Sequence, residues 1–372
     1  MRDPFARNCG LAFFLLLSIS HSRDVKAQAP GKAQVLNAIE SQRARWEACA
    51  QDIWSYAEVG FQEDKSSLRL QKELASAGFA IQAGVAEMPT AFVASYGSGK
   101  PVIAILAEFD ALPGLSQAST PERKVLREGG AGHACGHHLF GAASAAAAVA
   151  VKDWLVASGT SGTLRVYGTP AEEGGGGKVY MVRGGLFSDV DAVLSWHPGD
   201  ENLASPESTL ANLNAKFRFH GLSSHAAVAP DQGRSALDGL QAMTYMVDMM
   251  REHVPPQTRI HFVITRGGNA PNVVPDFAEL YIYVRHPHNA VLKEIFDRVV
   301  KASEGAALGT GTRVEHEILN GVYSKLPNET LSLIVDANLR RVGGFTLTEA
   351  ETAFATTLRT SLARPRPLES TQ

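Results

Sequence analysis

The chain has 372 residues, of which 45% are hydrophobic and 20% are charged, and its formal net charge is -3. This length exceeds what one hydrophobic core usually organises, so we expect two domains. The composition is that of a soluble globular protein rather than a disordered one, and the slightly acidic charge argues against nucleic acid or an anionic membrane surface as a partner.

The first 29 residues have the layout of a secretory signal peptide. Arg2 and Arg7 precede an apolar run over residues 10–19. The small residues Ala27 and Ala29 follow at a plausible cleavage point. The apolar run is too short to span a bilayer comfortably, and an uncleaved anchor is the alternative. We therefore expect an exported protein, periplasmic or secreted, without a stable membrane span.

Apolar periodicity predicts alternating helices and strands over the next part of the chain. The spacing is helical over residues 35–57, 66–77 and 139–156, and apolar runs predict strands at 91–96, 102–106, 163–168 and 192–196. Strands that alternate with helices are typical of an α/β domain with a largely parallel sheet. We expect such a catalytic domain to begin at residue 30 and to extend to residue 208.

The pattern changes after about residue 206. The order is then strand, helix, two strands, helix and strand, with strands at 210–220, 259–265 and 278–284 and helices at 236–251 and 290–305. This order predicts a small α+β sandwich of the split βαβ, ferredoxin-like type. We expect residues 209–323 to form this inserted domain, and the helical residues 324–372 to return to the catalytic domain as an incomplete second part.

Side chains that can bind metal follow the predicted strands of the first domain. They are Glu108 and Asp110 after strand 102–106, Glu172 and Glu173 after strand 163–168, and His197 after strand 192–196. A further run, Gly132-His133-Ala134-Cys135-Gly136-His137-His138, precedes the alanine-rich helix. Open α/β sheets carry their active sites at the carboxyl ends of the strands. The sequence therefore predicts a metal site at this edge.

The residue types suit hydrolysis assisted by metal. Cys135 and His137 offer a thiolate and an imidazole two residues apart, and Glu173 and His197 add oxygen and nitrogen donors. Adjacent carboxylates rarely both bind one ion with good geometry, so one member of the pair Glu172 and Glu173 is free to act as a general base.

Three neighbouring features have alternative interpretations. Asp110 is suited to hold a histidine ligand in the correct tautomer. Cys135 is better used as a metal ligand than in a disulfide with Cys49, the alternative that an oxidising compartment leaves open. The glycines at 174–177 lack the spacing of a nucleotide-binding loop, so we reject that function.

Several motifs together resemble a family of metallo-amidohydrolases that includes aminoacylases, glutamate carboxypeptidases and plant auxin-conjugate hydrolases. The resemblance covers about residues 35–360 and rests on Ala107-Glu108-Phe109-Asp110-Ala111-Leu112-Pro113-Gly114, His133-Ala134-Cys135-Gly136-His137, residues 169–178 and Trp196-His197. It implies Cys135, His137, Glu173 and His197 as metal ligands, Glu172 as general base, and two divalent ions, Zn²⁺ or Mn²⁺. The implied substrate is an N-acyl or aromatic-acyl amino acid, with p-aminobenzoyl-glutamate as the leading candidate.

The resemblance implies three further functional residues in the inserted domain. His225, in the segment Gly221-Leu222-Ser223-Ser224-His225-Ala226, would reach across a homodimer and stabilise the oxyanion in the partner subunit. Asn272 and Arg285 would hold the carboxylate of the substrate. Taken without the resemblance, His225 is an ordinary loop residue and Arg285 an edge-strand charge.

Two departures from the family's pattern keep rival functions open. Family members carry one more metal-binding histidine near their end, whereas no histidine follows His316 here, and Glu108 stands where many relatives have a histidine ligand. We therefore expect a chain truncated at its end. The rivals to an active amidohydrolase are a catalytically inactive relative and an exported binding protein for amino-acid conjugates. A second hydrolase subunit is a further expected partner.

Overall fold

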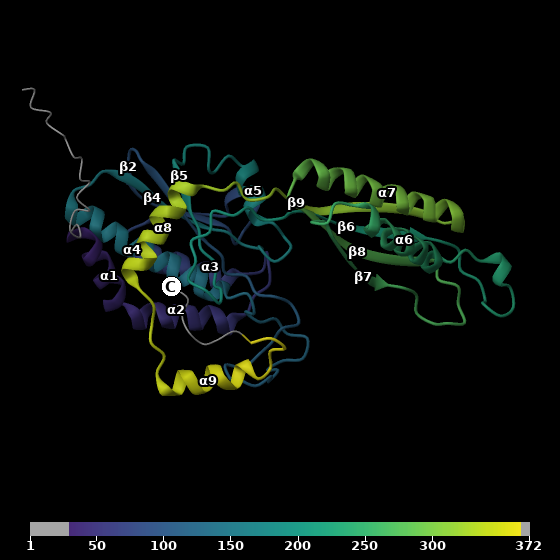
Figure 1. The fold of residues 1–372 in the computed structure, drawn as a ribbon, viewed down its shortest axis with the longest axis horizontal. Helices are drawn as coiled ribbons and strands as arrows, with labels where there is room; N and C mark the ends of the chain where they lie inside the picture. Colours follow the sequence, from purple (N-terminus) through teal and green to yellow (C-terminus); the bar gives the residue numbers. More distant parts are fainter. Residues whose placement is uncertain (1–29, 366–372) are drawn as a thin grey trace, which may run out of the picture.

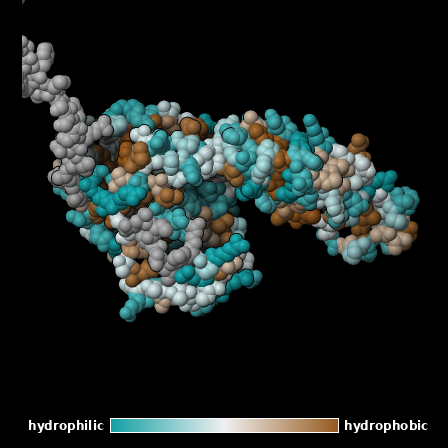
Figure 2. Space-filling model, in the orientation of Figure 1, coloured by the Kyte–Doolittle hydropathy of each residue, from teal (hydrophilic) through white to brown (hydrophobic). Residues whose placement is uncertain are grey.

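The computed structural model describes residues 30–365, so the predicted signal peptide lies outside the described residues. These residues form two lobes joined by a narrow neck (Figures 1 and 2). The first lobe carries a five-stranded sheet and the second a four-stranded sheet.

The sheet of the first lobe is mixed, and its parallel part carries the candidate site. Its strands are β1 (Ala80–Ala83), β2 (Phe92–Ser98), β3 (Val102–Ala107), β4 (Gly162–Gly168) and β5 (Ala192–Leu194), in the order β1-β2-β4-β3-β5. β1 pairs with β2 and β2 with β4 in antiparallel orientation, whereas β3 pairs parallel with both β4 and β5. The predicted largely parallel sheet is thus realised only by β3, β4 and β5.

Helices cover this sheet and form the core with it. They are α1 (Pro30–Ser41), α2 (Arg43–Tyr56), α3 (Asp64–Ser76), α4 (His137–Ser158) and the short α5 (Gly177–Arg183), with a 3₁₀ turn η1 (Val85–Glu87). The single helix expected over 35–57 is broken at Gln42. The short strand β1 and helix α5 were not predicted, because each is too brief to show a period.

Helix α4 is the central helix of the first lobe. It is long and apolar enough to cross a membrane, but half of its most apolar window is buried inside the lobe. It packs against α1, α2, β3 and β4. Its alanines allow this close approach, and we therefore interpret α4 as a core helix. Its first residue, His137, is fully buried at the sheet edge.

The second lobe is an antiparallel sheet with two helices on one face. The strands β6 (Ala211–His220), β7 (Arg259–Arg266), β8 (Phe277–His286) and β9 (Arg313–Val322) lie in the order β7-β8-β6-β9, with α6 (Ala236–Met250), α7 (Asn289–Thr310) and the 3₁₀ turns η2 (Pro230–Gln232) and η3 (Arg251–His253). Phe217 and Phe219 of β6 and Ile282 of β8 face the helices and are fully buried. Alternate residues, including Arg285, therefore lie on the open face of the sheet.

After β9 the chain returns to the first lobe (Figure 1). It forms α8 (Glu329–Val342) and α9 (Glu349–Arg359), capped by Asn328 and Thr348 respectively. The Lys32 ammonium donates a hydrogen bond to the side-chain oxygen of Asn338 at 2.9 Å, which joins α8 to α1. The boundaries 30–208, 209–323 and 324–372 stay predictions, and the two sheets occupy residues 80–194 and 211–322.

The close pairing of β2 with β4 allows a prediction about stability. Gly97 has φ +81°, and a Cβ added there would lie 2.2 Å from the carbonyl oxygen of Gly162. Gly84 also has a positive φ, +68°, but a Cβ there would meet open space. We expect Gly97→Ala to lower the free energy of unfolding by about 2 kcal/mol more than Gly84→Ala does. Denaturant unfolding followed by circular dichroism measures both, and equal losses would contradict the assigned contact.

Candidate metal centre

The carboxyl ends of three parallel strands bring the predicted ligands together. Because β3, β4 and β5 run in one direction, the residues that follow them meet at one edge of the sheet. The amino-terminal turn of α4 is at the same edge and supplies Cys135 and His137. Gly136, with φ +80°, precedes α4 in a left-handed conformation, and this lets the chain turn sharply between the two donors.

One group of possible ligands contains a thiol and two imidazoles. The donor atoms of Cys135, His137 and His197 all lie within 4.8 Å of one another. The Cys135 sulfur and His197 Nε2 are 3.3 Å apart. His197 Nδ1 donates to the carbonyl oxygen of Pro198 at 2.8 Å, which leaves Nε2 with its lone pair facing Cys135. This is the tautomer that a histidine ligand requires.

A second group shares His137 and adds two carboxylates. Donor atoms of Glu108, His137 and Glu172 also lie within 4.8 Å of one another. His137 Nε2 is 3.0 Å from Glu108 Oε2. Neither atom has a hydrogen-bond partner of acceptable geometry among the described residues, although both are buried. Two close donor atoms without a mutual hydrogen bond are arranged as ligands of a common ion would be.

Asp110 supports the two groups of possible ligands through hydrogen bonds. His137 Nδ1 donates to Asp110 Oδ1 at 2.9 Å. The backbone N–H of Glu173 donates to Asp110 Oδ2 at 2.8 Å. The Asp110 carboxylate is buried and both of its oxygens accept hydrogen bonds, so it orients the His137 imidazole and the Glu172-Glu173 turn. This is the supporting role expected for Asp110 from the sequence.

The two adjacent glutamates have different surroundings. Glu172 is exposed and belongs to the group with Glu108 and His137. Glu173 belongs to neither group, but its Oε1 is buried without a hydrogen-bond partner among the described residues. Its charge and a hydrogen bond act on the Cys135 thiol, so Glu173 lies beside the thiol. The geometry therefore offers both carboxylates to metal, Glu172 beside Glu108 and His137, and Glu173 beside Cys135.

The electrostatics of the cluster suit a divalent cation. Desolvation and the negative charge of Glu173 raise the pKa of the Cys135 thiol to about 12. Desolvation and the charge of Glu108 raise the pKa of Glu172. Burial disfavours the charged form of His137, but the carboxylates of Asp110 and Glu108 outweigh it and raise its pKa to about 10. The site thus holds excess negative charge, and the residues fit a divalent metal ion, which would offset that charge.

Two further residues support the site and were not found from the sequence. Glu63 is fully buried and accepts hydrogen bonds from the Ala171 N–H at 2.7 Å and from the Thr90 hydroxyl at 2.9 Å. It thereby holds Ala171, which has φ +54°, immediately before Glu172. Lys178, on α5, forms an ion pair with Glu108. Glu63 is 108 residues away from Ala171, and no local pattern indicates such a contact.

The three residues expected from the second lobe separate into two places. Arg285 lines a cavity of about 230 Å³ between the lobes, together with Glu172, Glu173, Lys178 and Tyr283. His225 and Asn272 lie side by side, since the Ala226 N–H donates to the Asn272 carbonyl oxygen at 3.0 Å. Both are exposed and belong to the loops at the other end of the sheet.

The structure does not contain the alternative disulfide between Cys49 and Cys135. Cys49 and Cys135 are both free thiols. Cys49, a residue of α2, is fully buried in the core, and desolvation raises the pKa of its thiol to about 12. Cys135 is therefore available to the cluster at the sheet edge.

Comparison with known proteins yields close relatives. Residues 211–310 match the model of a peptidase dimerisation domain. The chain is 45% identical over 328 residues to one of the subunits of p-aminobenzoyl-glutamate hydrolase from Escherichia coli (strain K12), an alignment that covers 88% of this chain and 68% of that protein. It is 31% identical over 326 residues to Xaa-Arg dipeptidase of Mus musculus, covering 84% and 72%.

Solved structures share the fold. An aminobenzoyl-glutamate utilization protein from Klebsiella pneumoniae aligns with a TM-score of 0.63 at 17% identity, covering 88% of this chain and 91% of that one. A dinuclear metal-binding peptidase of the M20 family from Bacillus subtilis aligns with a TM-score of 0.56 at 21% identity, covering 83% and 82%. The predicted α/β metallohydrolase fold with an added dimerisation domain is confirmed. This chain belongs to the M20 family of metal-dependent peptidases and amidohydrolases.

Proposed function

We propose that this protein hydrolyses the amide bond of N-acyl amino acids with an aromatic acyl group, such as p-aminobenzoyl-glutamate. The observation that carries the proposal is the position of His137, whose buried Nε2 makes no hydrogen bond of acceptable geometry among the described residues and lies within reach of the donor atoms of both ligand groups. The substrate class is supported by the 45% identity to a p-aminobenzoyl-glutamate hydrolase of Escherichia coli.

The site would hold two divalent ions, Zn²⁺ or Mn²⁺. Cys135, His137 and His197 would bind one ion, and Glu173 would complete its shell from beside the thiol. Glu108, the buried carboxylate of the second group, would bind the second ion. A divalent ion in this place polarises the amide carbonyl and makes water more acidic.

The residues of the chain would then move the proton and hold the substrate. Glu172 would take the proton from the attacking water and pass it to the leaving amine, a role supported by its exposure and its raised pKa. Arg285 lines the same cavity and would bind the carboxylate of the amino acid. The alternative assignment makes Glu172 a third ligand with Glu108 and His137.

A homodimer would complete the site. The ten residues of β8 span about 30 Å of extended chain, and they separate the end near Arg285 from the end near Asn272. His225 and Asn272 would therefore act on the cavity of a second copy, where His225 would stabilise the oxyanion. The match of residues 211–310 to a dimerisation domain supports this arrangement. Pairing with a second hydrolase subunit and export to the periplasm or medium remain predictions.

Two substitutions at neighbouring residues test the division of roles. We expect Glu172→Gln to retain the metal content of the wild type and to lower kcat by about a thousandfold, because the amide cannot accept the proton. We expect Glu173→Gln to lose metal. Elemental mass spectrometry after dialysis and hydrolysis of p-aminobenzoyl-glutamate measure the two properties. Equal metal loss in both variants would show that Glu172 is a ligand.

The shared imidazole gives a second test. We expect the dialysed wild type to hold two ions per chain, and His137→Asn and His197→Asn each to hold one, because both histidines belong to the group with Cys135 and each Nε2 has a single lone pair for one ion. Elemental mass spectrometry gives the stoichiometry, and circular dichroism checks that each variant is folded. A His137→Asn variant that keeps both ions would contradict the assignment of His137 as a ligand.

A further inference from the structure

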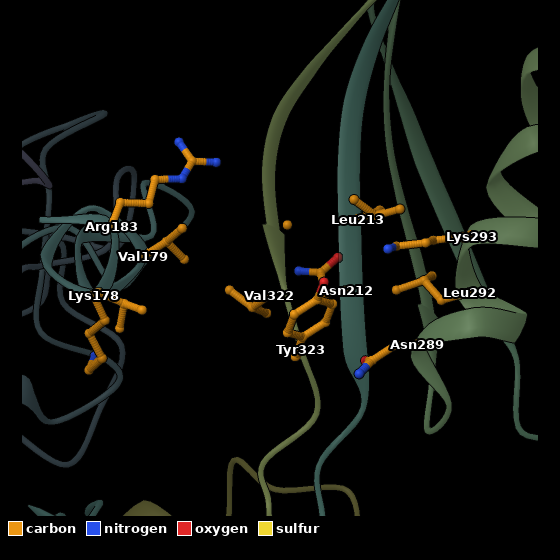
Figure 3. A pocket seen from close by; sticks show the side chains of 12 residues that line it. Lys178, Val179, Arg183, Asn212, Leu213, Asn289, Leu292, Lys293, Val322 and Tyr323 are labelled. Carbon is orange, nitrogen blue, oxygen red and sulfur yellow. The ribbon is translucent and has the colours of Figure 1, made fainter. Parts of the chain in front are cut away.

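A second cavity lies between the lobes, at the hinge. It has a volume of about 500 Å³ (Figure 3). Helix α5 of the first lobe and β6, α7 and β9 of the second supply its walls, and we call it the hinge cavity. Its lining residues are Lys178, Val179, Val182, Arg183, Asn212, Leu213, Asn289, Leu292, Lys293, Gly321, Val322 and Tyr323.

The hinge cavity is on a different side of the second lobe from the cavity that contains Arg285. Leu213 packs with the core beneath the helices, and Leu292 and Lys293 belong to α7, so the hinge cavity opens on the helix-bearing side. Asn214, Tyr283 and Arg285 lie on the open face of the sheet. Among the described residues, four line both cavities: Lys178, Val179, Asn212 and Val322. The hinge cavity includes neither Glu172 nor Glu173.

The charged groups of the hinge cavity are all cationic. Its lining contains Lys178, Arg183 and Lys293 and no aspartate or glutamate. Lys178 is paired with Glu108, but among the described residues no carboxylate lies within 4.0 Å of the charged nitrogens of Arg183 or Lys293. These two cations approach aromatic rings instead, that of Tyr180 at 5.9 Å and that of Tyr323 at 5.7 Å. Two cations are thus available to an anion.

The rest of the surface is mainly apolar. Val179 of α5 lies across the cavity from Leu213, Leu292 and Val322 of the second lobe (Figure 3), and Val182 also lines it. The side-chain oxygen of Asn212 is buried without a hydrogen-bond partner among the described residues, so it can accept a hydrogen bond from water or from a donor group. An apolar chamber with cations at its wall favours a ligand that has an apolar body and one anionic group.

We propose that the hinge cavity binds a small aromatic carboxylate at a site separate from the candidate metal centre. The ring would pack between Val182 and Leu292, and the carboxylate would bind Arg183 and Lys293. Since the walls come from both lobes, the ligand would connect α5 to α7 and stabilise one arrangement of the lobes. Helix α5 begins four residues after Glu173, so this arrangement bears on the candidate metal centre.

Benzoate is a suitable probe, and isothermal titration calorimetry on the purified full chain measures its binding. We expect one saturable site in the wild type and about tenfold weaker binding in the double variant Arg183→Gln/Lys293→Gln, because it removes both cations. Lys301→Gln is the matched control, since Lys301 is exposed on the same helix and does not line the cavity. It should bind benzoate as the wild type does.

Two further variants make the outcome decisive. Val182 is 64% exposed, so Val182→Trp should fold, fill the cavity and abolish binding. Arg285→Gln should leave binding unchanged, because Arg285 lines the other cavity. The proposal is overturned if benzoate does not bind saturably, or if Arg285→Gln loses binding while the double variant keeps it. Hydrolytic activity is not part of the readout, so the result is independent of the proposed function.

Discussion

The candidate site depends on the buried carboxylate of Asp110. Its two oxygens accept hydrogen bonds from the His137 imidazole and from the Glu173 backbone, so the end of β3 is joined to the start of α4 and to the turn after β4. A buried carboxylate is costly unless its oxygens are satisfied, and here the partners are the groups whose positions matter. Asp110 thereby turns Nε2 of His137 toward both ligand groups.

The surroundings of Asp110 explain why metal is the natural occupant. Glu108, Glu172, Glu173 and Cys135 converge at one sheet edge, and Lys178 is the cation that forms an ion pair with one of them. Burial, together with this concentration of acidic groups, raises the pKa of the thiol and of Glu172, and a divalent ion relieves the repulsion by replacing protons. Glu63 holds the backbone of Ala171, whose φ is +54°, and thereby helps to position the turn that contains Glu172.

The second lobe extends the site along its sheet in two directions. Its open face brings Arg285 to the glutamates, whereas His225 and Asn272 lie at the opposite end, on the order of 30 Å away. One strand length therefore separates Arg285, beside the candidate metal centre, from His225 and Asn272, which the proposed homodimer would bring to the site of a second copy. The helix-bearing side adds the hinge cavity, which is lined by Arg183 of the first lobe and Lys293 of the second. The neck is thus where both cavities and both lobes meet.

The fold class and the chemical nature of the site could be predicted from the amino-acid sequence. Hydrophobic periodicity marked the strands, and the position of Glu108, Asp110, Glu172, Glu173 and His197 directly after them predicted a metal edge, because chain direction and strand ends are local properties. Packing in three dimensions controlled the rest. It made the sheet mixed, gave His137 to two ligand groups, and brought Glu63 to Ala171 across 108 residues. It also formed the hinge cavity from four elements of two lobes. Such contacts depend on how helices and strands pack against one another, and the hydrophobic periodicity of the sequence does not specify that packing.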